Sequence, residues 1–264
     1  MADQTHFAIV QYDGGGFAGW QRQSEERTVQ GVLEDGLERI TDIHRVTHAA
    51  GRTDAGVHAL GQVVSFRVPD RWTSPELRRA LNAVTPADLW IADVGEAPPD
   101  FNARKHAVAR RYRYVLGCGA ESASPFRRPF EWALRKAVDF DLLQAAAVLF
   151  VGEHDFRSFS SVGQEKPHYR CRIVASDWQQ RPSGQGFIFH IEANRFLHRM
   201  VRFVVGMMVD VGLGKRPMDD IAALLGAANN AEASPPAPPE GLYMVGALYE
   251  EPGLHRINEF VSRQ

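Results

Sequence analysis

A single carboxylate stands among residues that could support a reaction. The run at 50–59, AGRTDAGVHA, holds two glycines, a cation, a hydroxyl and an imidazole around Asp54. No other acidic residue occurs between positions 42 and 70. An ionised carboxylate can act as nucleophile, base or electrostatic stabiliser. Arg52, two residues away, would favour the ionised form if the loop brings the two side chains together, which suits a nucleophile better than a proton donor.

Other kinds of chemistry have weaker signals. Glycoside hydrolysis ordinarily needs a second carboxylate at a matched distance, and the run has none. His44 and His48 have i,i+4 spacing, but no glutamate lies between them and no third ligand is evident, so no metal site is expected. No Gly-Lys-Ser/Thr follows the early glycines, which argues against a phosphate-binding P-loop.

The elements around Asp54 predict that it lies on a loop leading into a strand. The run at 62–68 is rich in β-branched and aromatic residues, with Ser65 and Arg67 alternating against apolar neighbours. Glycines at 51 and 56 predict a turn before it. Two interpretations stay open: a working residue on a rigid scaffold, or a turn aspartate that hydrogen-bonds its own backbone.

The rest of the first part of the chain predicts an α+β arrangement. Three glycines at 14–16 allow close approach to another segment. Apolar residues at helical spacing predict a helix capped by Thr28. A second helix is predicted with Ser74 as N-cap and Pro75 at its first position. Further strands are predicted at 7–12 and 89–94.

The second part opens with a predicted strand at 109–116. This strand places Arg111 and Arg113 on one face and Tyr112 and Tyr114 on the other. Tyr114 is expected in the core. The apolar helix at 196–211 is expected in the core as well, or in part at an interface. Other predicted elements are helices at 142–149 and 221–225, strands at 173–174, 186–193 and 241–249, and a low-complexity loop at 227–239.

Charge distribution says more than net charge, which is −2. No acid occurs from 102 to 120, while that segment carries five cations interleaved with Tyr112 and Tyr114, and a second basic cluster lies at 195–202. Local basic patches of this kind steer a polyanion. Two cysteines make no secreted disulfide framework, and neither a leader peptide nor a membrane-spanning run is evident. A cytoplasmic protein is expected.

Five motifs in order resemble the tRNA pseudouridine synthase A family. The run RTDAGVH at 52–58 looks like that family's catalytic loop without a substitution. The other matches are YDG at 12–14 with GWQRQ at 19–23, RRYRY at 110–114, NRFL at 194–197 with MVR at 200–202, and EGLY at 240–243. Together they cover the chain from about residue 7 to about residue 250.

The resemblance implies a fold and a site. The fold is α+β: two RRM-like (ferredoxin-like) halves whose antiparallel sheets join around a central catalytic cleft. Residues 1–101 and 102–264 are the expected domains, since the proline-containing stretch at 97–102 favours a linker. Asp54 is implied as the nucleophile, Tyr112 as the residue against the flipped base, and Leu242 as pocket lining. Either Arg170 or Arg172 would partner the carboxylate. Further substrate-binding residues are expected to be Arg110, Arg111, Asn194 and Arg202, with Trp20 and Gln21 near the cleft mouth.

The resemblance also implies the reaction. It is the isomerisation of uridine to pseudouridine at positions 38–40, in the anticodon stem-loop of tRNA, without a cofactor, by a homodimer. Whether Asp54 attacks C6 of the base or C1′ of the ribose stays open. Alternatives are a synthase of this family acting on another RNA, and a non-catalytic RNA-binding protein on the same fold. The presence of both Asp54 and Tyr112 disfavours the second.

Overall fold

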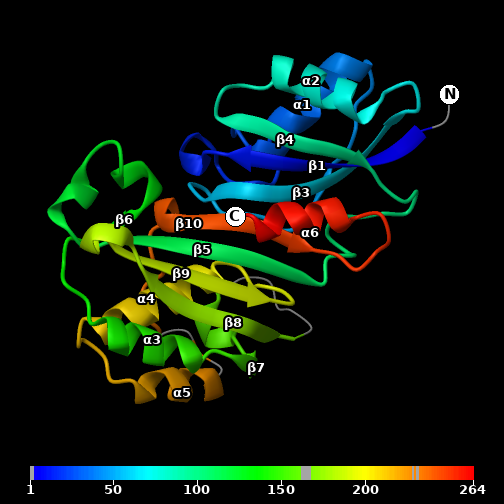
Figure 1. Ribbon diagram of the computed structural model, residues 1–264. Coiled ribbons are helices and arrows are strands. Elements are labelled where there is room, and N and C mark those ends of the chain that lie inside the picture. The colour runs from blue at the N-terminus through cyan, green and yellow to red at the C-terminus, as the bar shows by residue number, and fades with distance from the viewer. Residues whose placement is uncertain (1–2, 162–167, 228, 230–231) are drawn as a thin grey trace. The chain divides into compact units, whose positions relative to one another are not determined.

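The computed structural model describes residues 3–161, 168–227, 229 and 232–264. The chain forms two compact units (Figure 1): unit 1 comprises residues 1–110 and 243–264, and unit 2 comprises residues 111–242. The boundary expected after residue 101 falls within unit 1, which also takes the C-terminal end of the chain. Of the predicted loop at 227–239, residues 228, 230 and 231 lie outside the described residues.

Unit 1 is built on a mostly antiparallel sheet. Its long strands are β1 (Asp3–Tyr12), β3 (His58–Pro69) and β4 (Leu89–Glu96), in the order β4-β1-β3. The short β2 (His48–Ala49) pairs antiparallel with β3, and β10 (Leu242–Leu248) pairs parallel with it through Tyr243 and His58. Near-continuous burial along β1 and β3 explains their apolar runs.

Helices α1 (Val29–Thr41) and α2 (Ser74–Val84) pack against each other. The predicted cap of α1 is confirmed, because the Thr28 hydroxyl accepts a hydrogen bond from the Gly31 N–H at 3.2 Å. The predicted cap of α2 is wrong by one residue. Thr73 is the N-cap, because the Glu76 carboxylate accepts hydrogen bonds from both the N–H and the hydroxyl of Thr73. The C-terminal α6 (His255–Ser262) packs on β3.

The main strands of unit 2 follow the order β5-β9-β8-β7. These strands are β5 (Ala109–Gly117), β7 (Gly152–Asp155), β8 (Arg170–Gln180) and β9 (Gly186–Ala193), and the short β6 (Trp132–Ala133) pairs parallel with β5. Its helices are α3 (Phe140–Val148), α4 (Met200–Gly212) and α5 (Asp219–Gly226).

Helix α4 belongs to the core of unit 2. Met207 and Met208 are fully buried, and the Trp178 indole N–H donates to the Met208 sulfur at 3.4 Å. The helix begins at Met200 rather than 196, after Arg199 adopts a left-handed conformation (φ 59°). Tyr114 is also fully buried, as expected, and its hydroxyl donates to the Pro238 carbonyl at 2.8 Å.

The fold class is confirmed at the level of a mixed α/β protein with mostly antiparallel sheets. The described residues also form six short 3₁₀ helices: η1 (Gly14–Gly16), η2 (Ala120–Ala123), η3 (Arg128–Phe130), η4 (Arg157–Phe159), η5 (Pro182–Gly184) and η6 (Pro239–Gly241). The first of these is the predicted glycine run. Its Gly14 lies so close to the Val57 carbonyl that a Cβ there would sit 2.1 Å from the oxygen. The predicted close approach is confirmed.

Candidate catalytic loop and substrate-binding residues

The candidate catalytic loop, residues 50–57, lies between β2 and β3 in unit 1. It closes with a turn in which the Val57 N–H donates to the Asp54 carbonyl at 3.2 Å. Gly56, the third residue of this turn, has φ 78°, a conformation that favours glycine there. Thr53 and Val57 on either side are buried, whereas Asp54 is half-buried. The sequence of the loop therefore holds Asp54 at the surface between two anchored neighbours.

A second segment, residues 17–20, supports this loop from a distance of more than thirty positions along the chain. The Trp20 N–H donates to the Thr53 carbonyl at 3.0 Å, and the Gly56 N–H donates to the Phe17 carbonyl at 3.3 Å. Gly19 has φ 97°, and a Cβ on it would lie 2.8 Å from the Thr53 carbonyl oxygen. Only glycine leaves room for the two backbones to approach this closely.

Buried side chains of the sheet also form hydrogen bonds with the catalytic loop. The Tyr12 hydroxyl and the Thr53 hydroxyl are hydrogen-bonded at 2.8 Å, and burial raises the pKa of Tyr12 to about 12, so this phenol is neutral at physiological pH. The Gln62 amide donates to the Gly51 carbonyl at 2.6 Å. These contacts fix the backbone on the N-terminal side of Asp54.

His58, which ends the motif, is buried and stacks on Tyr243, with ring centroids 4.8 Å apart. Its Nδ1 accepts a hydrogen bond from the Gly14 N–H at 3.0 Å, which places the proton of the neutral ring on Nε2. The Asp13 carboxylate lies 3.2 Å from the same nitrogen. His58 thereby joins the glycine run to the start of β3.

Arg52, expected to act on Asp54, and Arg110, expected at the substrate, differ in their surroundings. Arg52 is exposed. The half-buried Arg110 donates to three backbone carbonyls, those of Ala50 (3.2 Å), Ala107 (2.8 Å) and Arg104 (2.7 Å). Its guanidinium ties the start of the catalytic loop to the segment that precedes β5.

Tyr112 and Arg111 lie on β5 in unit 2. Tyr112 is 8% exposed, and its ring meets Phe196 edge to face, with centroids 5.1 Å apart. The Arg111 guanidinium pairs with the Glu192 carboxylate at 2.5 Å. An aromatic ring and a paired cation therefore stand on neighbouring positions of the same strand.

The remaining predicted residues of unit 2 fall into two groups. Arg170 and Arg172 are exposed on β8, and Arg170 pairs with Glu153 at 3.1 Å. Asn194 binds the backbone of Arg172, because its side-chain oxygen accepts from the Arg172 N–H at 2.9 Å. Arg202 donates from Nε to the Ala237 carbonyl at 2.7 Å, and Leu242 is buried. Asn194 and Arg202 thus bind the backbone of unit 2 itself.

Sequence reasoning missed several residues of the site and misplaced one. Trp20, expected near the RNA, is only 2% exposed and packs beside Tyr12. Thr53 and Gln62 had no assigned role, yet both hold the loop. Tyr12 and Gly19 were noted only as parts of family motifs. Their place in those motifs was the one signal in the sequence that could have indicated a role at the site.

The described residues contain neither a metal-ligand cluster nor a helix that could span a membrane. Among these residues, no three or more His, Cys, Asp and Glu side chains gather where they could hold a metal ion. Within the same part of the chain, no helix has the length and apolar character needed to cross a membrane.

Comparison with known proteins identifies the class. A family model described as tRNA pseudouridine synthase matches residues 8–104 and 146–250, which places the chain among pseudouridine synthases. Curated relatives named tRNA pseudouridine synthase A include those of Limosilactobacillus fermentum (40% identical over 91% of this chain and 94% of the relative), Thermotoga neapolitana (38%, 92% and 98%) and Maridesulfovibrio salexigens (38%, 93% and 90%). The chain belongs to the tRNA pseudouridine synthase A family, whose members are isomerases that convert uridine to pseudouridine. The resemblance of the five motifs is confirmed.

Proposed function

We propose that this enzyme isomerises uridines 38–40 in the anticodon stem-loop of tRNA, with Asp54 as the nucleophile and no cofactor. The reaction breaks the N-glycosidic bond, turns the base while the enzyme holds it, and forms a carbon–carbon bond from C5. It neither consumes water nor changes oxidation state. A covalent nucleophile suits it because one difficult step is divided into two.

The observation that carries the assignment is the way the loop presents Asp54. Neighbouring residues are anchored by Trp20, Phe17 and Tyr12, while Asp54 itself is half-buried at the turn. A backbone held by hydrogen bonds on both sides of a carboxylate supplies the preorganisation that catalysis requires.

We also propose roles in substrate binding for the other predicted site residues. Tyr112 and Leu242 would contact the flipped uridine, whose removal from the stack costs a few kcal/mol. Arg170 and Arg172 are exposed and therefore accessible to phosphates, while Arg52, also exposed, would act with Asp54 in catalysis. Arg111 would contribute after exchanging Glu192 for phosphate. Arg110, Asn194 and Arg202 would act by holding the backbone that carries these groups.

We also propose that unit 1 is an RRM-like half. Its elements follow the order strand, helix, two strands, helix, strand. The second strand is the short β2, and the last strand is β4. The pairings β4-β1-β3 and β3-β2 are all antiparallel, as this fold requires. A homodimeric assembly in the cytoplasm is proposed with it, and sedimentation of the purified protein measures the assembly.

The test maps pseudouridine at every uridine of purified tRNA after incubation with the enzyme and no added cofactor. Modification is expected at positions 38–40. Asp54→Asn, nearly isosteric, is expected to abolish it while tRNA affinity stays within about tenfold, or about 1.4 kcal/mol. Asp70→Asn, at an exposed aspartate of unit 1, is the matched control and should retain full activity.

Two results would overturn the proposal in different ways. Turnover of Asp54→Asn near that of Asp70→Asn would remove Asp54 as nucleophile. Modification confined to uridines outside 38–40, or to another RNA, would leave the nucleophile in place and change the substrate.

A further inference from the structure

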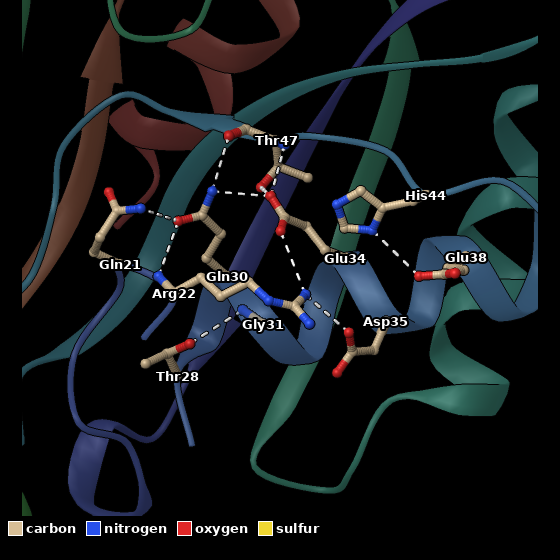
Figure 2. Close-up of polar contacts among 10 residues, drawn as sticks. All are labelled: Gln21, Arg22, Thr28, Gln30, Gly31, Glu34, Asp35, Glu38, His44 and Thr47. Atoms are coloured by element: carbon tan, nitrogen blue, oxygen red, sulfur yellow. Dashed lines mark hydrogen bonds and ion pairs between the residues drawn. The ribbon is translucent and has the colours of Figure 1, made fainter. Parts of the chain in front are cut away.

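We propose that Gln30 and Glu34, two buried residues of α1, are positioning residues for the catalytic loop. The inference rests on the proposed role of Asp54. Figure 2 shows the two side chains at the centre of a polar network that joins α1 to the segment containing Gln21 and Arg22 and to the segment containing Thr47. Gln30 is 7% exposed and Glu34 is 3% exposed. Buried polar side chains of this kind are costly unless their hydrogen bonds are satisfied, and here they are.

Gln30 binds the segment that supports the loop. Its side-chain oxygen accepts hydrogen bonds from the Arg22 N–H (3.0 Å) and from the Gln21 amide (2.8 Å). Its backbone N–H donates to the Trp20 carbonyl at 3.0 Å. Because the Arg22 N–H is a donor only, the orientation of the Gln30 amide is determined, and its NH₂ group faces Glu34.

Glu34 binds the segment that leads into the loop. One carboxylate oxygen accepts from the Thr47 N–H (2.9 Å), the Thr47 hydroxyl (3.1 Å) and the Gln30 amide (2.9 Å). The Gln30 amide also donates to the Thr47 carbonyl at 3.3 Å. Thr47 immediately precedes β2, after which the catalytic loop begins. The other oxygen of Glu34 lies 3.5 Å from the Arg22 guanidinium.

The two side chains therefore join both supports of Asp54 into one unit. The Gln30 side chain holds the Arg22 N–H, and two residues earlier the Trp20 N–H donates to the Thr53 carbonyl, next to Asp54. Glu34 fixes Thr47, from which the chain continues into the loop. Loss of the network would leave the fold of α1 in place, since Val29, Leu33 and Leu37 bury its apolar face, but would allow the loop to shift. A shift of about 1 Å can cost about a hundredfold in rate.

The main test compares Gln30→Met with a matched control, Asn82→Leu. Methionine keeps the length of the side chain and removes its hydrogen bonds. Asn82 also joins two elements of unit 1, because its side chain donates to the Ile91 carbonyl (3.0 Å) and accepts from the Ile91 N–H (2.9 Å). The control therefore removes two side-chain hydrogen bonds, both of them between α2 and β4. Glu34→Gln is a milder variant, expected to fold, because its amide oxygen can still accept from Thr47.

Three quantities are measured for each variant: the single-turnover rate at saturating tRNA, the dissociation constant for tRNA, and amide hydrogen exchange in residues 50–57. Gln30→Met is expected to lower the rate about ten- to a hundredfold, with the dissociation constant changed less than about threefold. Exchange in residues 50–57 should be faster by about tenfold, since the loop opens locally more often. Glu34→Gln should change rate and exchange in the same direction by smaller factors, and Asn82→Leu should change neither.

Unchanged rate and exchange in Gln30→Met would overturn the proposal. So would an equal loss of rate in Asn82→Leu at a similar melting temperature, because the effect would then be general destabilisation. If Gln30→Met does not fold, unchanged exchange and rate in Glu34→Gln would overturn it instead. If Asp54→Asn is active, the nucleophile assignment is wrong. Amide hydrogen exchange does not depend on activity, so it still decides whether Gln30 holds the loop.

Discussion

At the scale of residues, the arginines of the basic motifs do different work. Arg110 is surrounded by the carbonyls of Ala50, Ala107 and Arg104, whereas Arg172 is exposed on β8. A cation whose donors are used on the backbone stabilises the fold. A cation in solvent is available to phosphate. Residue type and neighbours in sequence do not distinguish these two cases.

Arg110→Met is therefore expected to destabilise the protein by about 2–3 kcal/mol, because three carbonyls lose a charged donor. Arg172→Met should leave unfolding unchanged and make the dependence of log K on log salt shallower by about 0.7–0.9, the value for one phosphate contact. Urea unfolding and tRNA binding across salt concentrations measure the two effects. The reverse pattern, with stability lost at Arg172 and the salt slope changed at Arg110, would contradict the assignment.

Two substitutions of Tyr112 are expected to distinguish a role in packing from a role in the reaction. Tyr112→Phe keeps the edge-to-face contact with Phe196 and should melt like the parent enzyme. Its single-turnover rate should fall about a hundredfold if the hydroxyl takes part in proton removal from C5 of the base. Tyr112→Ala should in addition lose about 3–5 kcal/mol of stability, because the ring is buried. Full activity in Tyr112→Phe would exclude a role of the hydroxyl and leave contact with the base to the ring alone.

At the scale of elements, the catalytic loop depends on a second loop that sequence reasoning treated separately. The segment at 14–20 contributes Gly14 and Gly19, whose missing side chains let its backbone meet residues 53–57. Local signals predicted a turn at each place. These local signals did not predict that the two loops contact each other.

Gly19→Ala is expected to damage both stability and rate. Its Cβ would meet backbone atoms of Thr53, Asp54 and Ala55 within 3.2 Å, at a φ of 97°. Gly214→Ala is the control, since Gly214 has φ 66° with nothing within 4 Å and should cost only the strain of about 1–2 kcal/mol. Thermal melting and single-turnover rates compare the two. Equal melting losses with no loss of rate in Gly19→Ala would show that the close approach is unimportant for catalysis.

At the scale of the whole molecule, stability should depend on pH through a buried histidine. His6, on β1, is fully buried, and burial lowers its pKa below 6.5 although Glu96 partly opposes this. The unfolded chain then binds the proton more readily than the folded chain. Stability is complete above about pH 6.5 and falls as the pH drops from there toward the folded pKa.

His6→Gln is expected to remove this part of the pH dependence. The free energy of unfolding of the parent protein should fall between pH 7.5 and 5.5 by more than that of the variant, by up to about 1.4 kcal/mol over the pH unit below 6.5. His255→Gln, at an exposed histidine of α6, is the control and should follow the parent. Parallel curves for the parent and His6→Gln would contradict the expectation.

The sequence by itself determined what depends on near neighbours and on shared motifs. Helical spacing and the Thr28 cap predicted α1, alternation predicted β3 and β5, and the five motifs placed the chain in its family. The predicted N-cap of α2 was wrong by only one residue, because the bond between Glu76 and the true N-cap, Thr73, is also a contact between near neighbours in sequence.

Only the tertiary structure decided what holds Asp54. The bonds from Tyr12 and Trp20 to Thr53 and from Gln30 to Arg22 join segments that approach each other only when the sheet and α1 assemble. The buried state of Trp20 and the carbonyl partners of Arg110 arise in the same way. Hydrogen-bonding capacity is a property of the residue type, but the partner is chosen by the packing of distant segments, and no local pattern records that choice.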